Sequence, residues 1–249
     1  EWLRNGNSES PVMLRFADGS ETWADHVIVT ISLGVLKGES GLFVPPLPES
    51  KKEAITKLGY GVVNKVFMET DQKDFPFLQL AFHDSKSEHR RKEVPWWMRK
   101  TPTLCPIYRN SSVLLAWFVG EEAKAIESLP EEDIITGVSE TLTWFCSDHS
   151  RLDGRSGSGK VKLKRVLRTK WGSDPLFMGS YSYIAVGSSG NDIDTLAEPL
   201  PAVVGEGFRP LQILFAGEAT HRTHYSTTHG AYFSGIREAC RLLDYYHCV

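Results

Sequence analysis

The chain has 249 residues, with 28 lysines and arginines, 31 aspartates and glutamates, 41% hydrophobic residues and four cysteines. This composition is typical of one or two globular domains and excludes collagen-like, disordered and disulfide-rich classes. The net charge of −3 gives no broad basic field, so we expect no nucleic-acid partner. The cysteines form no CxxC pair, which favours a reducing compartment over a zinc site or a disulfide framework.

The sequence was also considered for a membrane-spanning helix and for a leader segment at its start. The longest apolar run, residues 27–36, is far shorter than the roughly 18 residues that a spanning helix needs, so we expect no membrane segment. Residues 1–4 contain no initiator methionine, signal core or transit pattern, and they run directly into a predicted strand. We therefore expect the chain to be a fragment of a longer protein.

The first elements are predicted to be a β-hairpin and a buried strand. Residues 12–16 have strand composition, and Asp18-Gly19 suits the positive φ of a hairpin turn. The Val/Ile run at 27–30 is typical of a strand covered on both faces. Residues 49–58 follow a proline-rich loop and have helical spacing, which predicts a surface helix with Gly59 as its stop.

The middle and end of the chain alternate strand and helix patterns. Residues 72–100 are predicted to be a loop-rich excursion with Trp96-Trp97 as an aromatic anchor. Strands are predicted at residues 61–68, 113–119, 161–167 and 212–216, and helices at 131–145 and 228–246, with a Gly/Ser loop at 153–160.

Two motifs suggest chemistry that their context does not support. Residues 154–160 match the start of a phosphate-binding loop, but Val161 stands where Ser or Thr would hold magnesium, and no strand precedes the motif, which predicts a surface turn. His221, His224 and His229 lie within nine residues, yet their spacing completes no ligand set. We expect no metal site.

The segment after residue 212 is more informative. A buried strand that ends in Gly217-Glu218 places ligand contacts at its carboxyl end, where open α/β sheets bind cofactors. The next helix begins with Thr228-His229-Gly230, whose small residues let a flat ligand approach amides that attract negative charge. Tight packing of a helix on a sheet would require the same small residues, so both interpretations stay open.

Lys65 and the Tyr181/Tyr183 pair also allow two interpretations. Lys65 lies in an otherwise apolar stretch and either faces water or is held in a cleft where it organises a water molecule. Tyr181 and Tyr183 are either ordinary strand residues or the wall of a cage for an amine, because an aromatic face attracts a cation.

Four motifs in order, residues 24–37, 63–65, 179–183 and 215–231, resemble those of the flavin-dependent amine oxidases. Within that family the chain is similar to plant polyamine oxidases of the thermospermine/spermine oxidase type, notably through residues 95–99 and 104–108. The similarity covers essentially the whole chain.

The resemblance implies an α/β fold in which a Rossmann-like FAD-binding domain, residues 1–61 and 190–249, is interrupted by a substrate-binding domain of mixed sheet and helices (α+β), residues 62–189. The Gly-x-Gly-x-x-Gly turn that binds the cofactor pyrophosphate in this family does not occur in these residues. We expect that amino-terminal part of the FAD-binding domain to be missing and to lie upstream of Glu1.

The resemblance also implies residue roles. Lys65 matches the catalytic lysine that holds a water at flavin N5, and Tyr181 would lie beside the substrate amine, with Thr227 opposite it. Where Thr227 stands, many relatives carry an aromatic residue, so the cage would have one aromatic wall. The implied cofactor-binding residues are Trp171, Gly217, Glu218, Thr227, Thr228 and Gly230.

The implied activity is FAD-dependent polyamine oxidation. Hydride would pass from the carbon next to an uncharged secondary amine to flavin N5, the imine would hydrolyse, and O2 would be reduced to H2O2. We expect a cytosolic monomer whose partners are a polyamine and O2. Two alternatives remain: a histone-lysine demethylase, which residues 187–192 also resemble, and a truncated product that binds no flavin.

Overall fold

The computed structural model divides the chain into two compact units, residues 1–61 with 175–249 and residues 62–174. Their assignment to flavin and to substrate binding stays a prediction. No described helix is long and apolar enough to cross a membrane. The structure describes residues 1–2, 10–38, 41–71, 73, 75–82, 94–101, 103–149, 162–202 and 209–248, without side chains at 146–149. The glycine-rich turn at 154–160 lies outside these ranges.

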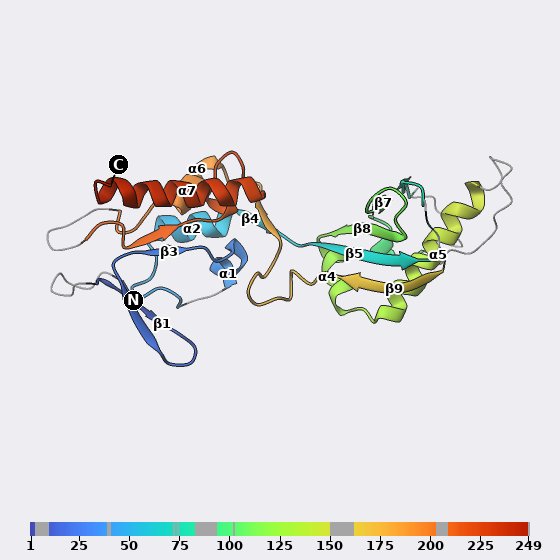
Figure 1. Cartoon of the computed structure of the whole chain (residues 1–249), viewed down its shortest axis with the longest axis horizontal. Helices are drawn as coiled ribbons and strands as arrows, with labels where there is room; N and C mark the ends of the chain where they lie inside the picture. Colours follow the sequence, from blue (N-terminus) through green and yellow to red (C-terminus); the bar gives the residue numbers. More distant parts are fainter. Residues whose placement is uncertain are drawn as a thin grey trace. The chain divides into compact units, whose positions relative to one another are not determined.

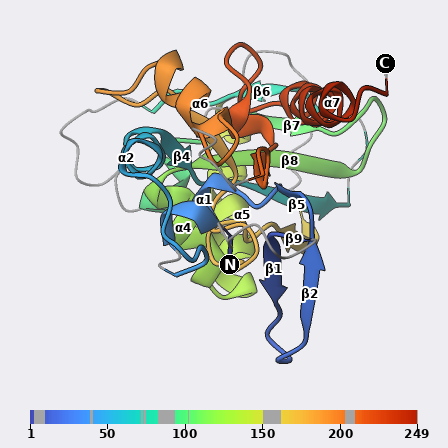
Figure 2. The same cartoon turned by 90° about the vertical axis from the view of Figure 1, so that its left-hand side faces the viewer.

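The first unit opens with the predicted hairpin. Strand β1 (Val12–Arg15) pairs antiparallel with β2 (Glu21–Ala24), and Gly19 adopts φ +84° in the turn between them. The Asp18 carboxylate accepts hydrogen bonds from the Ser20 amide and hydroxyl, which closes the turn. The hairpin extends away from the rest of its unit (Figures 1 and 2).

A parallel strand pair positions the candidate site. Strand β3 (Val27–Val29) pairs with β11 (Ile213–Phe215), although the two are far apart in sequence. All of β11 is buried as predicted, whereas Ile28 in β3 is 39% exposed, so the expectation of a fully buried strand there is wrong. Parallel pairing is typical of doubly wound sheets, and the Rossmann-like assignment stays a prediction.

Helices cover this strand pair within the first unit. They are α1 (Leu33–Gly38), α2 (Glu49–Lys57), α6 (Gly190–Ala197), the 3-10 turn η2 (Glu218–Thr220) and α7 (Thr228–Tyr245). A capping box at Ser189 and Asp192 starts α6, where the Ser189 hydroxyl accepts from the Asn191 amide. Their inner faces and the strands enclose one apolar core that includes Leu33, Ile55, Leu196 and Phe215.

The end of α2 differs from the expectation that Gly59 stops it. The helix ends at Lys57 because Leu58 turns to extended backbone, and Gly59 begins β4 (Gly59–Gly61). This strand pairs antiparallel with β10 (Tyr181–Tyr183). A side-chain carbon on Gly59 would overlap the Tyr183 ring, so the glycine serves close packing.

The second unit contains one five-stranded sheet in the order β6-β7-β8-β5-β9. A mixed sheet was expected, but every pairing among its described strands is antiparallel. Helices α4 (Glu121–Ser128) and α5 (Glu131–His149) pack against it (Figure 1). The strands are β5 (Val63–Thr70), β6 (Leu78–Gln79), β7 (Thr103–Pro106), β8 (Val113–Val119) and β9 (Leu163–Arg168).

Two details of this unit refine the sequence prediction. In the 3-10 turn η1 (Trp96–Met98), Trp97 is the buried anchor and Trp96 is 53% exposed. In β9, a register shift in the pairing with β5 places Val166 opposite the buried Met68. Leu167 is consequently 69% exposed, although simple alternation predicts that it faces inward.

Candidate functional site

A cavity of about 290 Å³ lies at the carboxyl ends of β3 and β11. Ligands of open α/β sheets bind at this end of the strands. The end of β3 and the residues after it, Val29 to Leu33, line one side of the cavity, and Phe215 to Thr220 of β11 and η2 line another. The remaining lining residues come from other elements of the same unit: Leu36, Tyr60, Leu176, Phe177, Ser180, Leu196 and Ala231. It is therefore the candidate site of the first unit.

Gly217 leaves the end of β11 open toward this cavity. Its φ is +130°, and a side-chain carbon built on it would meet no atom within 4 Å. Its amide donates to the Ser234 hydroxyl over 2.8 Å, which fixes the strand end to α7. The glycine thus combines a left-handed backbone with free space in front of it.

Glu218 ties three segments of the first unit together. One carboxylate oxygen accepts from the Ser182 amide at 3.1 Å, and the other accepts from the Ser182 hydroxyl at 2.6 Å and from the Ser226 amide. The Ser226 hydroxyl in turn donates to the Ser182 carbonyl. This carboxylate therefore holds the loops beside the cavity; its hydrogen bond to a cofactor stays a prediction.

The start of α7 is capped by Thr227. The Thr227 side chain accepts from the Gly230 amide at 3.1 Å and donates to the His224 carbonyl at 2.7 Å. Within the described part of the chain, the amides of Thr228 and His229 have no hydrogen-bond acceptor. Two N–H groups at the positive end of an 18-residue helix are thus available to a negatively charged group.

Gly230 has a packing role, which was one of the two interpretations of the small residues at this helix start, but its contact is with the preceding loop. A side-chain carbon on it would overlap the His224 carbonyl oxygen, so the glycine lets the preceding loop lie against the helix. That loop is closed by the His224 amide, which donates to His221 Nδ1 at 3.1 Å. Burial and the neighbouring His224 and Arg237 lower the pKa of His221. The described residues contain no group of three metal-ligating side chains.

Tyr181 and Tyr183 are alternate residues of β10 and therefore lie on the same face of the strand, with Ser182 on the other. Tyr183 packs its ring on Gly59, which accounts for it as a structural residue. Tyr181 is partly buried opposite Gly61, and burial raises the pKa of its hydroxyl. The buried Ser182 between them points to Glu218. Tyr181 is thereby fixed next to the residues that Glu218 brings together.

Lys65 lies in the second unit, on the partly exposed face of β5. Its ammonium nitrogen is 4.5 Å from the centroid of the Trp117 ring, opposite it in β8. Partial burial lowers the pKa of the Lys65 amine. Its backbone amide and carbonyl both bond to Thr169, and Trp171 follows two residues later. Lys65 and Trp171 are therefore connected through one short segment.

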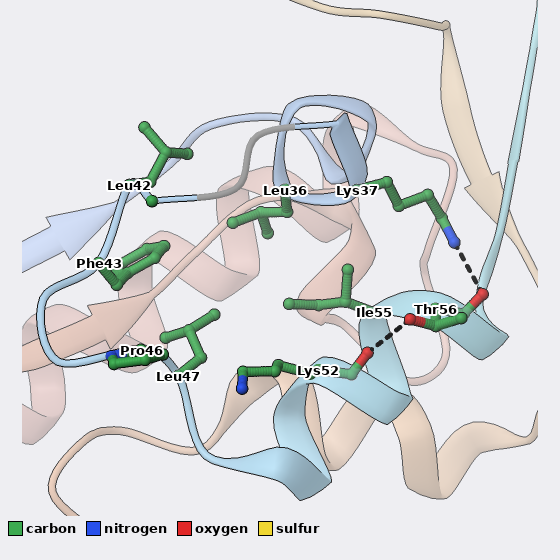
Figure 3. Close-up of a pocket in the computed structure, with 10 residues that line it drawn as sticks. Leu36, Lys37, Leu42, Phe43, Pro46, Leu47, Lys52, Ile55 and Thr56 are labelled. Atoms are coloured by element: carbon green, nitrogen blue, oxygen red, sulfur yellow. Dashed lines mark hydrogen bonds between the residues drawn. The ribbon is translucent and has the colours of Figure 1, made fainter.

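A larger cavity of about 560 Å³ lies between α1, α2 and the loop after residue 41 (Figure 3). Leu36, Phe43 and Ile55 make most of its wall apolar. The Lys37 ammonium donates to the Thr56 carbonyl at 2.9 Å, as Figure 3 shows, rather than facing the space. Lys52, also in its lining, pairs with Glu49, so we place the candidate site at the smaller cavity, which lies at the carboxyl ends of the parallel strands.

Comparison with known proteins identifies the family. Residues 2–243 match the family model described as flavin containing amine oxidoreductase. The chain belongs to this family. It is 52% identical to "Probable polyamine oxidase 5" of Arabidopsis thaliana over its whole length, and 47% identical to "Polyamine oxidase 1" of Oryza sativa subsp. japonica over 95% of it. It is 43% identical to the human "Peroxisomal N(1)-acetyl-spermine/spermidine oxidase" over 94%.

The chain spans about half the length of these curated relatives: 50% of each plant protein and 45% of the human one. The comparisons confirm the resemblance to flavin-dependent amine oxidases, and FAD is the cofactor that they indicate. The mixed α/β composition of the structure agrees with this family. The individual contacts expected from Trp171, Gly217, Glu218, Thr227, Thr228 and Gly230 stay predictions.

The residues of the first unit leave room for part of a flat cofactor such as a flavin. The space in front of Gly217 is open, and the Thr228 and His229 amides lie at the positive end of α7, which favours a negatively charged group. Glu218 is the exception, because its carboxylate already accepts three hydrogen bonds. A contact from Glu218 to the cofactor would have to share these oxygens with Ser182 and Ser226.

Several polar residues that shape the two units were not expected from the sequence. Ser182, Ser226 and Ser234 orient the first unit's site, and only the position of Ser182 and Ser226 inside the matched motifs could have marked those two. In the second unit, the unexpected residues are Asn64 and Glu127, both buried. Asn64 could have been noticed as a polar residue on the inward face of a strand.

Proposed function

We propose that the chain takes part in FAD-dependent oxidation of polyamines of the spermine and thermospermine type. The observation that carries this is the cavity at the carboxyl ends of β3 and β11, where Gly217 faces open space and Ala231 contributes the first turn of α7 to the lining. Membership of the flavin containing amine oxidoreductases supports flavin chemistry at this cavity. The names of the plant relatives support the substrate class.

FAD, when bound, would supply the acceptor for a hydride removed from the carbon next to a secondary amine. The chain's part is to hold that group and to steady its charge. Gly217 would let the ring lie against the strand end, and the Thr228 and His229 amides would donate to its negative edge. Thr227 keeps these amides in place by capping the helix.

Lys65 and Tyr181 would act on the substrate side. Lys65 has a lowered pKa, so a larger fraction of its amine is neutral and able to exchange a proton with a held water than in a free lysine. Tyr181, beside Ser182, offers an aromatic face that attracts an ammonium group of a polyamine. The polyamine must present an uncharged nitrogen next to the carbon that is oxidised.

The test is a side-by-side assay of the FAD-loaded protein with spermine, thermospermine and a methylated histone peptide, with H2O2 as the readout. The proposal predicts peroxide from at least one of the two polyamines and none from the peptide. Peroxide from the peptide alone would replace it by histone demethylation. A protein that takes up no FAD, so that it lacks the visible flavin absorbance, would support the non-catalytic alternative.

A further inference from the structure

Asn64 is completely buried and uses its whole hydrogen-bonding capacity. It lies on the inward face of β5, opposite to the face of its neighbour Lys65. Its amide group donates to the Ala123 carbonyl at 3.1 Å and to Glu127 Oε1 at 2.5 Å. Its oxygen accepts from the Thr169 hydroxyl at 2.8 Å and from the Trp171 amide at 3.1 Å. One side chain thus joins α4 to the segment 169–173.

Glu127 completes the connection from α4. Its carboxylate accepts from the amides of Gly172 and Ser173, each at 2.8 Å, in addition to Asn64. Burial by itself raises the pKa of Glu127, but the hydrogen bonds from Ser173, Asn64 and Gly172 outweigh it and lower the pKa below the ordinary value. The group is therefore a buried carboxylate held as an anion, with no salt bridge to any described residue.

The helix that carries Glu127 is itself fixed at its end. Arg168 of β9 donates to the carbonyls of Ile126 and Leu129, which are among the last acceptors of α4. Thr169, the next residue, bonds to both backbone groups of Lys65. The Glu127 carboxylate, the Asn64 side chain and the end of β9 at Arg168 and Thr169 therefore belong to one hydrogen-bond network.

Stability of the core alone would not require a buried polar network at this position. Apolar residues of the same volume often stabilise as well as a buried charged pair, because a carboxylate loses its hydration on burial. A fully satisfied polar network instead fixes one geometry. Here the fixed geometry is that of Trp171 and of its neighbours relative to Lys65.

We propose that Asn64 and Glu127 are positioning residues for the oxidation reaction. They fix the position of the segment 169–173, and with it Trp171, relative to Lys65. They do so from the face of β5 opposite to that of the Lys65 side chain. This inference rests on the proposed function. It adds two residues to the machinery that touch neither substrate nor cofactor and act through the segment that they hold.

The experiment compares three variants of the FAD-loaded protein: Asn64→Asp, Glu127→Gln and the double variant. Asn64→Asp places two carboxylates together and removes the amide donor. Glu127→Gln leaves one acceptor oxygen for the Gly172 and Ser173 amides. In the double variant, the side-chain amide at position 127 can donate to the carboxylate at position 64, so the repulsion between two carboxylates is removed. The carboxylate at position 64 can then accept from the Trp171 amide in the original position.

Two readouts are taken for each variant. Amide hydrogen exchange at Trp171, Gly172 and Ser173 needs neither cofactor nor substrate and reports the network directly. The limiting rate of flavin reduction at saturating spermine reports the reaction. Thr141→Val is the matched control, because it removes a buried hydrogen bond of 2.7 Å to Gly137 within α5, away from this network.

The proposal predicts that both single variants exchange the three amides at least about tenfold faster and reduce flavin about tenfold to a hundredfold more slowly, as a misplacement of about 1 Å would cause. The double variant should recover protection at Trp171 and part of the rate, and Thr141→Val should change neither. Faster exchange with an unchanged rate of flavin reduction would overturn the positioning role while leaving the proposed function intact. If neither spermine nor thermospermine reduced the flavin of the wild-type protein, the proposed function would be overturned and this role with it.

Discussion

Gly230 lies so close to the backbone of His224 that any side-chain carbon on it would overlap the His224 carbonyl oxygen. The same carbonyl accepts the hydroxyl of Thr227, which caps α7. The position of the first helix amides therefore depends on one glycine contact and one threonine side chain. This makes the helix start a rigid part of the candidate site.

Replacing Gly230 by alanine should move the start of α7 and weaken flavin binding. The added methyl group has to displace backbone rather than a flexible side chain, so we expect a loss of stability of about 1–3 kcal/mol. Gly235→Ala is the matched control on the same helix, because a carbon there meets no atom within 4 Å. The control should be neutral or stabilising by up to about 1 kcal/mol. Thermal unfolding and FAD titration measure both, and equal behaviour of the two variants would contradict the packing role of Gly230.

Lys51 is a second fixed point of the first unit and is 2% exposed. Its ammonium donates to the carbonyls of Thr195, Leu196 and Glu198, and it lies 4.2 Å from the centroid of the Phe215 ring. Burial lowers the pKa of Lys51 to about 7. A neutral amine has two N–H groups and would leave one carbonyl unpaired, so the three acceptors oppose that shift and favour the ammonium.

We expect Lys51→Met to destabilise the first unit by about 2–4 kcal/mol, because the end of α6 loses the donor for its carbonyls. Lys52→Met, one residue along, should cost less than about 1 kcal/mol, since the Lys52 ammonium only pairs with Glu49 on the surface. Urea unfolding of both variants checks the difference. Similar midpoints would show that the buried ammonium contributes no more than an exposed one.

The buried Glu127 should make stability depend on pH in a defined direction. Its pKa is below the ordinary value of 4.5, so its stabilising contribution is complete above that value and is lost as the pH falls through the lower folded-state pKa. The stability difference between wild type and Glu127→Gln should therefore be largest near neutral pH and shrink in acid. Glu121→Gln, at an exposed position of the same helix, should show little of this trend. A difference that grows on acidification would contradict the bound-anion description.

Lys65→Met should slow flavin reduction by a polyamine or flavin reoxidation by O2, because methionine cannot hold a water through an ammonium or amine. Stopped-flow absorbance measures both steps. Lys164→Met, at an exposed position in β9, is the control and should leave both rates unchanged. Wild-type rates for both steps in Lys65→Met would remove the role that the motif assigns to Lys65.

The sequence predicted the elements whose signals are local. Strand β8 agrees at both ends with the apolar run at 113–119, and helices α2 and α7 begin where their patterns begin. Helix α6 was missed, although the capping box at Ser189 and Asp192 was present as a signal. The exposure of Leu167 could not be foreseen, since it follows from a register shift that only the pairing of β5 with β9 defines.

The site was predictable in its motifs and not in its contacts. Gly217 was expected at an open strand end and has that geometry. Gly230 was expected to admit a ligand, but its nearest neighbour is the chain itself at His224. Glu218 and Asn64 have partners from segments far along the chain, Ser182 and Thr169 respectively, and no spacing rule connects such residues.

The most direct test of polyamine oxidation is an anaerobic titration of the FAD-loaded protein with spermine and with thermospermine, followed by visible absorbance. Without O2, a substrate that delivers hydride leaves the flavin reduced, and its oxidised absorbance band disappears. We predict loss of this band with at least one of the two polyamines and its return when air is admitted. A band that persists in the presence of both polyamines would contradict the proposed function.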